Sequence, residues 1–213
     1  MTIQFTIACA LFLTVICMHV TRKNYTAIAL YAVQSFIIAI LLAYTALSAG
    51  SRLLLAVALI TLLVKTIIAP ILFGRMIRKN KTFFSAQAHL DLPIVALIVA
   101  ALTLLPHLSA LAPLVAIAPS FATELYLTLS ALCISIFFLI NRRDVLSQAL
   151  GILSIENCIV SYAVFSGLEQ SAILQIGIVN DVCIWIIVVT MLASRVYKKF
   201  DTLDTNTMQQ LTD

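Results

Sequence analysis

The sequence predicts an all-α, polytopic membrane protein with about seven transmembrane helices. Hydrophobic residues occupy 62% of the 213 positions and charged residues 10%, whereas soluble domains carry roughly 25% charged residues. Seven apolar stretches of about 18–23 residues follow one another, and each is long enough to cross a hydrocarbon core of roughly 30 Å. Basic residues gather in alternate connections between these stretches, which is typical of membrane proteins.

The predicted helices can be drawn in order along the chain. The fourth is the least regular, because Pro106, Pro113 and Pro119 interrupt its apolar run. We predict a kink near Pro106 and then an ordered loop over the rest of 104–120; six helices with a re-entrant piece are the alternative. The seven segments cover residues 3–20, 25–47, 53–73, 92–111, 121–140, 146–166 and 172–194.

The basic residues predict the orientation of the chain. Eleven of the thirteen Lys and Arg residues follow the first, third, fifth and seventh predicted helices, while Arg52 follows the second and Lys65 lies inside the third. Since cytoplasmic connections carry the excess of positive charge, we predict an outer N-terminus and a cytoplasmic C-terminus. Residues 1–197 then form a transmembrane helical domain, and residues 198–213 a polar cytoplasmic tail.

Two carboxylates lie deep within predicted helices. Glu156 stands about ten residues into the sixth, and Asp181 about fourteen residues before Arg195. Ten helical residues rise about 15 Å, roughly half of the hydrocarbon core. A charge there costs at least about 2.5–3.5 kcal/mol, so Glu156 and Asp181 are predicted sites of a proton or ion pathway. A neutral Glu156 that merely hydrogen-bonds a neighbouring helix is the alternative.

Two further polar residues are candidates for the same pathway. Lys65 lies in the third predicted helix, five residues before Pro70. It is predicted either to exchange protons with a carboxylate or to extend its ammonium toward the cytoplasmic interface. Gln34, in the middle of the second helix, either relays protons or bonds across helices. By contrast, His19 and Asp144 fall at helix ends, where solvated groups are expected.

Several function classes are excluded by what the sequence lacks. It has no glycine-rich phosphate loop, no nucleophile elbow and no H-E-x-x-H motif, so we predict no catalytic residue and no metal ligand. The five cysteines lie in apolar runs without a C-x-x-C pair, and we expect packing residues rather than ligands of an iron–sulfur cluster. The basic residues stand in short clusters between the apolar runs, where they set the topology of the chain in the bilayer, and they give no signal for nucleic-acid binding.

Short motifs spread over nearly the whole chain resemble the hydrogenase-4 component E family. This family comprises NuoK-like membrane subunits of group 4 nickel–iron hydrogenase and formate hydrogenlyase complexes. The chain differs from the family pattern at Cys158, where Gly is frequent, and at Gln175, where Glu is frequent. The matching stretches are Tyr31-Ala-Val-Gln-Ser35, Leu63-Val-Lys-Thr-Ile-Ile-Ala-Pro70, Arg142-Arg-Asp-Val-Leu-Ser-Gln-Ala-Leu-Gly151, Ile155-Glu-Asn157, Ile176-Gly-Ile-Val-Asn-Asp181 and Thr202-Leu-Asp204.

The resemblance implies a non-catalytic subunit of a hydrogenase-like, complex I-related oxidoreductase in a bacterial or archaeal cytoplasmic (inner) membrane. Its partners would be antiporter-like membrane subunits and a peripheral hydrogenase arm that holds the nickel–iron centre and iron–sulfur clusters, with no cofactor in this chain. Glu156 and Asp181 would correspond to the two membrane carboxylates of the complex I subunit, and Lys65 to the family's lysine ahead of a proline. An autonomous cation or proton transporter and a purely structural assembly subunit are the alternatives.

Overall fold

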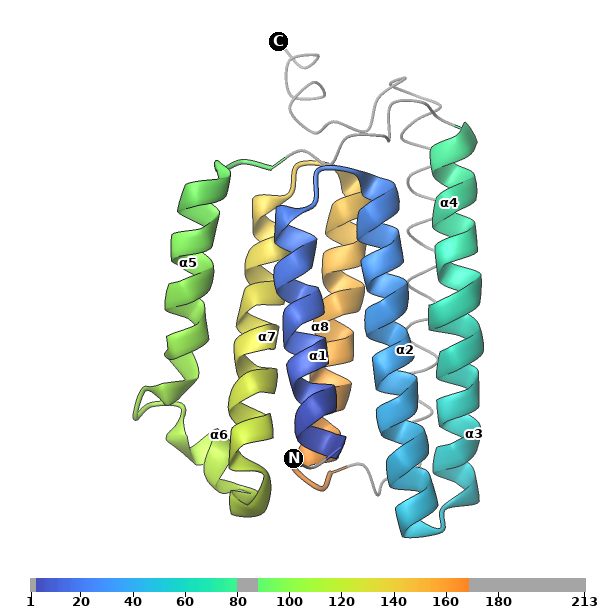
Figure 1. The fold of residues 1–213 in the computed structure, drawn as a ribbon, viewed down its shortest axis with the longest axis vertical. Helices are drawn as coiled ribbons and strands as arrows, with labels where there is room; N and C mark the ends of the chain where they lie inside the picture. The colour runs from blue at the N-terminus through green and yellow to red at the C-terminus, as the bar shows by residue number, and fades with distance from the viewer. Residues whose placement is uncertain (1–2, 80–87, 169–213) are drawn as a thin grey trace.

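The computed structural model describes residues 3–79 and 88–168, which form helices standing side by side (Figure 1). α3, η1 and α4 follow one another without a break and make one long rod. η1 is a π-helix, and η3 and η4 are single 3-10 turns. In chain order the elements are α1 (Ile3–Val20), α2 (Asn24–Ala49), α3 (Arg52–Thr61), η1 (Leu62–Ile68), α4 (Ala69–Lys79), α5 (Leu92–Leu104), η3 (Leu105–His107), α6 (Ala112–Ala116), η4 (Pro119–Phe121), α7 (Ala122–Asn141) and α8 (Val145–Phe165).

Five helical stretches in the described residues are long and apolar enough to cross a membrane. They coincide within a few residues with the first, second, third, fifth and sixth predicted helices, so the all-helical, multi-pass prediction is confirmed to that extent. The predicted seventh helix, 172–194, and the tail lie outside the described residues. The five stretches are Ile3–Val20, Asn24–Ala49, Arg52–Arg75, Pro119–Asn141 and Val145–Phe165.

The fourth predicted helix is shorter than expected from the sequence. α5 ends at Leu104, and the 3-10 turn that contains Pro106 ends at His107. Proline has no N–H and crowds the preceding turn, so the α-helix stops there rather than continuing to residue 111. The apolar helical segment Leu92–His107 rises about 24 Å, less than a hydrocarbon core of roughly 30 Å.

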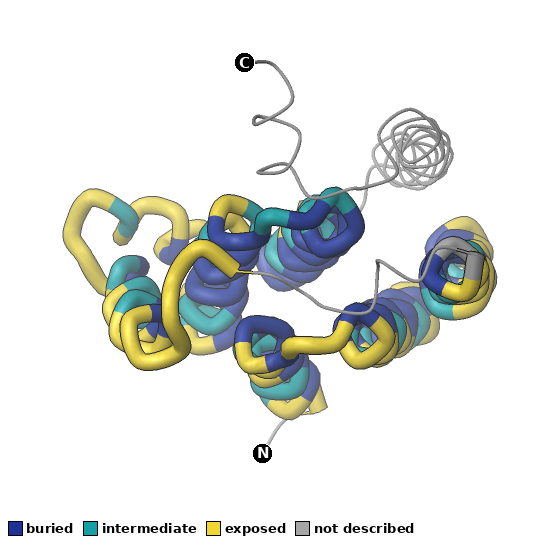
Figure 2. The backbone as a smooth tube through the Cα atoms, turned by 90° about the horizontal axis from the view of Figure 1, so that it is seen from above, coloured by how far each residue is buried: buried dark blue, intermediate teal, exposed yellow. Residues whose placement is uncertain are grey.

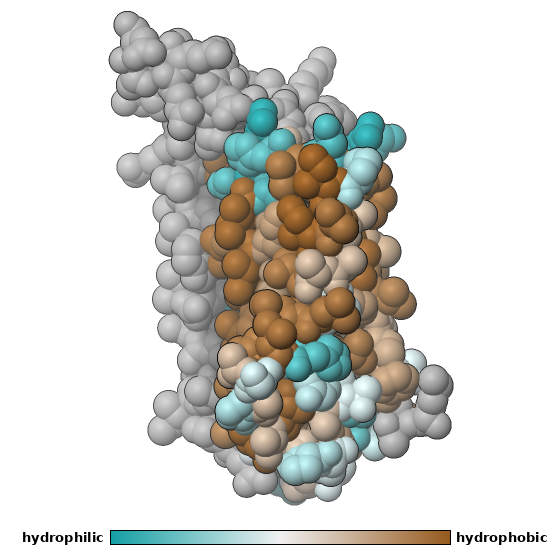
Figure 3. Space-filling view, turned by 90° about the vertical axis from the view of Figure 1, so that its left-hand side faces the viewer, coloured by the Kyte–Doolittle hydropathy of each residue, from teal (hydrophilic) through white to brown (hydrophobic). Residues whose placement is uncertain are grey.

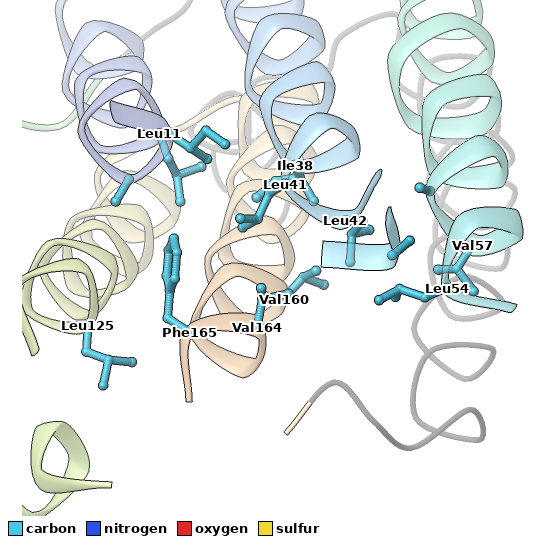
Figure 4. Packing of buried hydrophobic residues seen from close by; sticks show 14 of the residues in the cluster. Leu11, Ile38, Leu41, Leu42, Leu54, Val57, Leu125, Val160, Val164 and Phe165 are labelled. Atoms are coloured by element: carbon cyan, nitrogen blue, oxygen red, sulfur yellow. The ribbon is translucent and has the colours of Figure 1, made fainter. Parts of the chain in front are cut away.

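The core lies where α8 packs against α7 and α2, while α1 packs against α2 and α7 (Figure 2). In one apolar cluster, side chains from α1, α2, α3, α7 and α8 interlock, among them Leu11, Ile38 and Phe165 (Figure 4). Gly151 of α8 allows the backbones of α7 and α8 to approach closely. A Cβ at this position would lie 3.1 Å from the Cα of Leu139, so a small residue is required there.

The outer surface is apolar in its middle and polar at its ends. Figure 3 shows this pattern on the face that carries α5, where large apolar side chains such as Leu97 and Leu104 are exposed. An exposed apolar surface of this extent does not suit water but suits the hydrocarbon of a bilayer. The five long helices also expose large apolar side chains, among them Leu13, Leu59 and Ile140. The described part of the chain therefore suits a multi-pass membrane protein.

Three basic clusters lie at the same end of the bundle, which we call the basic end. It contains the α1–α2 and α7–α8 connections and the end of α4, at the top of Figure 1. Arg52 begins α3 at the opposite end. The arrangement matches the charge alternation in the sequence. The described basic residues of these clusters are Arg22, Lys23, Arg75, Arg78, Lys79, Arg142 and Arg143.

Arg142 is buried at this end, with 2% of its surface exposed. Its Nη2 donates hydrogen bonds to the carbonyl oxygens of Met18 (2.7 Å), His19 (3.3 Å) and Thr21 (3.0 Å). Met18 and His19 lie in the last turn of α1, where backbone carbonyls have no partner within the helix, and Thr21 follows the end of α1. His19 is also buried, with Nε2 3.1 Å from the Ile134 carbonyl oxygen. The expectation of a solvated His19 was therefore wrong, because the end of α1 is covered by α7.

Asp144 is likewise buried, although a solvated loop charge was expected. Its Oδ1 accepts hydrogen bonds from the backbone N–H of Ser147 (2.8 Å) and from Nδ2 of Asn24 (3.3 Å). It thereby caps the N-terminus of α8 and ties it to α2. Burial raises the pKa of the Asp144 carboxyl, while the bonds from Ser147 and the charge of Arg142 act in the opposite direction.

We expect Arg142→Leu to lower the free energy of unfolding by roughly 3 kcal/mol, because it leaves buried carbonyl oxygens without a donor. Thermal unfolding of the purified protein in mild detergent measures this loss. The neighbouring Arg143→Leu is the control and should cost less than about 1 kcal/mol, since its bond to His89 is exposed. Equal losses for the two variants would contradict a special role of Arg142 at the end of α1.

Candidate functional site

A buried ion pair joins the third and sixth predicted helices. Nζ of Lys65 lies 2.8 Å from Oε1 of Glu156, and the two side chains are 3% and 14% exposed. Both residues stand near the middle of their spans, Arg52–Arg75 and Val145–Phe165. The structure thus places Lys65 against a carboxylate in the interior and not with its ammonium extended to the interface.

The π-helix η1 determines where Lys65 points. Of its seven residues, Lys65 is the buried one, while Leu63, Ile67 and Ile68 face outward. The Ala69 N–H donates to the carbonyl oxygen of Val64, five residues back, which is the π register. Pro70 has no N–H for the usual bond four residues back, so the α-helical pattern is interrupted here. Such π-segments inside α-helices occur frequently at functional sites.

Asn157 connects the ion pair to α2. Its Oδ1 accepts a hydrogen bond from Nζ of Lys65 at 3.1 Å, and its Nδ2 donates to Oγ of Ser35 at 3.1 Å. Asn157 and Ser35 are fully buried. The Lys65 ammonium therefore has two oxygen partners from α8, one charged and one neutral, and it would keep one of them if Glu156 became neutral.

A second group of hydrogen bonds lies beside the first. Nε2 of Gln34 donates to Oγ of Ser154 at 2.9 Å, and the hydroxyl of Ser135 lies 2.9 Å from that of Ser154 and 3.6 Å from Sγ of Cys158. Gln34 adjoins Ser35 in the chain, and Ser154 lies one turn before Asn157. We call these residues together the polar network: Gln34, Ser35, Lys65, Ser135, Ser154, Glu156, Asn157 and Cys158.

The structure brings together three of the four predicted pathway residues. Lys65 and Glu156 are in direct contact, and Gln34 belongs to the same network. Asp181 lies outside the residues that the structure describes. No role was predicted for the serines. Their signal was weak, because Ser is common in membrane helices, but Ser154, Asn157 and Cys158 share one face of α8 by their spacing of three and four.

The site is one of charge and hydrogen bonding. In residues 3–79 and 88–168, no group of three or more His, Cys, Asp or Glu side chains gathers in a way that could hold a metal ion. The polar network instead combines a cation, a carboxylate, two amides, three hydroxyls and a thiol inside apolar helices. This arrangement can hold, release and transfer protons, or neutralise a passing cation.

No protein-family model, no curated protein and no solved structure matches this chain. The fold and the site define its class: a multi-pass helical membrane protein with a lysine–glutamate pair buried near the middle of its spans.

Proposed function

We propose that this protein is a non-catalytic membrane subunit of a multisubunit, hydrogenase-like oxidoreductase related to complex I, in which it helps to couple electron transfer to proton or sodium translocation. The Lys65–Glu156 pair is the observation that carries the proposal. The sequence motifs that resemble the hydrogenase-4 component E family support the choice of this family, of the partner subunits and of the bacterial or archaeal cytoplasmic membrane. In this proposal the chain has seven transmembrane helices, with its basic end and C-terminus in the cytoplasm.

The energetics of the ion pair support a role in translocation. Moving two charges out of water costs several kcal/mol for each, and a well-packed apolar pair is often at least as stable. A bundle that only needed to span a bilayer would therefore gain nothing from Lys65 and Glu156. Their cost is understandable if their protonation changes during a working cycle.

The contacts suggest an electrostatic mechanism. When a proton reaches Glu156, the Lys65 ammonium loses its counter-charge and keeps the neutral Oδ1 of Asn157. In this state Lys65 releases its own proton more readily, or its ammonium attracts another anionic group. Asp181 is the second protonation site of the proposal, and Gln34 is the relay. A change of charge at the redox arm would change the protonation state of one site, and the protonation of the neighbouring sites would change in response.

A structural role for the polar network is the second candidate, and its cross-helix bonds favour it. Ser35, Asn157 and Lys65 join three helices, and Ser135 joins a fourth. Interhelical hydrogen bonds of this type average about 0.6 kcal/mol in a membrane protein. Hydrogen bonds between neutral groups would be enough to hold the helices together, however. A structural role therefore does not explain the charges on Lys65 and Glu156.

Isolation of the tagged protein from its native membrane in mild detergent, with mass spectrometry of the co-purifying chains, tests the proposed assembly. We expect antiporter-like membrane subunits and a peripheral arm with nickel–iron or iron–sulfur centres. Recovery of this chain alone, as a monomer or homo-oligomer, would overturn the proposal and favour an autonomous transporter. An unrelated membrane protein with the same tag is the control for adventitious partners.

A further inference from the structure

A groove of about 620 Å³ opens on the surface between α2 and the rod formed by η1 and α4, which stand side by side in Figure 1. It extends along the rod from the level of η1 to the basic end. Its lining changes along this path from apolar to basic. The lining residues are Tyr25, Ile28, Thr66, Ile67, Pro70, Ile71, Gly74, Arg75 and Arg78.

The groove wall on the rod is one helical face. Ile67, Ile71, Gly74 and Arg78 are spaced by three or four residues, so they follow one another along that face. The space beside Gly74 is open, because a Cβ built there would meet nothing within 4 Å. Ile67 and Ile71 are about half exposed, so the inner part of the wall offers apolar surface for a hydrocarbon chain.

Two guanidinium groups stand at the basic end of the same groove. Arg75 follows Gly74 directly, and Arg78 lies one turn further along α4. Neither forms a salt bridge or a side-chain hydrogen bond with another residue in the described part of the chain, and no carboxylate lines the groove. Guanidinium groups bind phosphate oxygens through paired hydrogen bonds. Tyr25 on α2 stands opposite them, and tyrosine favours the headgroup level of a bilayer.

We propose that this groove is a binding site for an anionic phospholipid. The phosphate would lie between Arg75 and Arg78, and one acyl chain would lie along Ile67, Ile71 and Ile28. A free phosphate would use the arginines and leave the apolar wall uncovered, whereas a lipid suits both ends of the groove. Basic pockets between membrane helices are known to take acidic headgroups. The inference is independent of the proposed redox function.

The test is native mass spectrometry of the full-length protein, purified in mild detergent with whatever partners accompany it and titrated with phosphatidylglycerol or phosphatidylcholine. We expect tighter binding of phosphatidylglycerol, and a loss of about tenfold in its affinity in the Arg75→Gln/Arg78→Gln variant. The Arg22→Gln/Lys23→Gln variant removes the same charge from exposed residues at the same end and should retain the lipid. Equal losses in both double variants would overturn the site, since the binding would then follow net charge alone.

A second variant tests the apolar part of the groove without changing the charge. Gly74→Leu should obstruct the groove and lower phosphatidylglycerol affinity by about tenfold, whereas Ala56→Leu, on an exposed position of α3, should not. Full lipid affinity in Gly74→Leu would overturn the proposal. A cysteine cross-link from position 74 to residues 169–213, together with absence of bound lipid, would do the same and assign the groove to the chain itself.

Discussion

The Glu156→Gln variant should assemble normally and lose most ion translocation, by at least about tenfold. Glutamine has nearly the same volume, and its amide oxygen can still accept a hydrogen bond from Nζ of Lys65, which now lies 2.8 Å from Oε1. It cannot take up or release a proton at physiological pH. The variant therefore removes the titration. Loss of the negative charge lowers stability, but the Lys65 ammonium keeps the Oδ1 of Asn157, so we expect the subunit still to assemble.

The measurement uses the native complex in inverted membrane vesicles or proteoliposomes. Ion uptake is followed with a pH-sensitive dye or a sodium tracer, and the rate of electron transfer is recorded in the same sample. Assembly is checked by the yield of co-purifying subunits. A decrease in ions moved per electron, with assembly unchanged, is the expected result.

Glu124→Gln is a matched control for this experiment. Glu124 is another buried carboxylate, 7% exposed, in the first turn of α7 and outside the polar network. We expect its neutralisation to leave translocation within about twofold of the wild type. Normal translocation in Glu156→Gln would contradict a protonation site at Glu156. Failure of Glu156→Gln to assemble would favour the structural role of the network.

The second large effect is expected for Lys65→Met. This variant leaves Glu156 near the middle of the bundle with an uncompensated charge or with an additional proton. Removal of one member of a buried ion pair costs about 3–5 kcal/mol, and we expect the lower part of that range because Glu156 is 14% exposed. Thermal unfolding in mild detergent measures the loss. Lys23→Met, at an exposed lysine of the basic end, should change stability by less than about 0.5 kcal/mol.

The double variant Lys65→Met/Glu156→Gln separates stability from function. It carries no buried charge at the pair, so its stability should return to within about 1–2 kcal/mol of the wild type, a strong departure from additivity. Ion translocation should stay as low as in Glu156→Gln. Additive losses of stability would contradict the direct contact between the two side chains, and recovery of translocation would contradict their role in the pathway.

The hydropathy of the sequence was sufficient to predict five of the spans. Spanning a bilayer requires about 20 apolar residues, and this requirement is local to each segment. The same local rule failed at residues 104–111, where Pro106 ends α5 early although most of the residues around it are apolar. The π-segment was not predicted, although Pro70, which has no N–H for the usual α-helical bond, lies two residues past its end.

The polar residues at the helix ends were the least predictable. The sequence placed Arg142 only in a basic connection, but its guanidinium donates to carbonyls at the end of α1, which lie more than 120 residues earlier in the chain. Asp144 was expected in solvent, and it caps α8 beneath α2. A charged residue next to a span can face water or another helix, and hydropathy is the same in both cases.

By itself the sequence determined the class of this protein, the positions of its long spans and the rare charges within them, because each depends on the free energy of placing a residue in hydrocarbon. Tertiary structure alone decided which charges meet. Lys65 contacts Glu156 and Asn157, and Gln34 contacts Ser154. These partners depend on the rotation and depth of each helix relative to its neighbours, which are fixed by side-chain packing across distant parts of the chain.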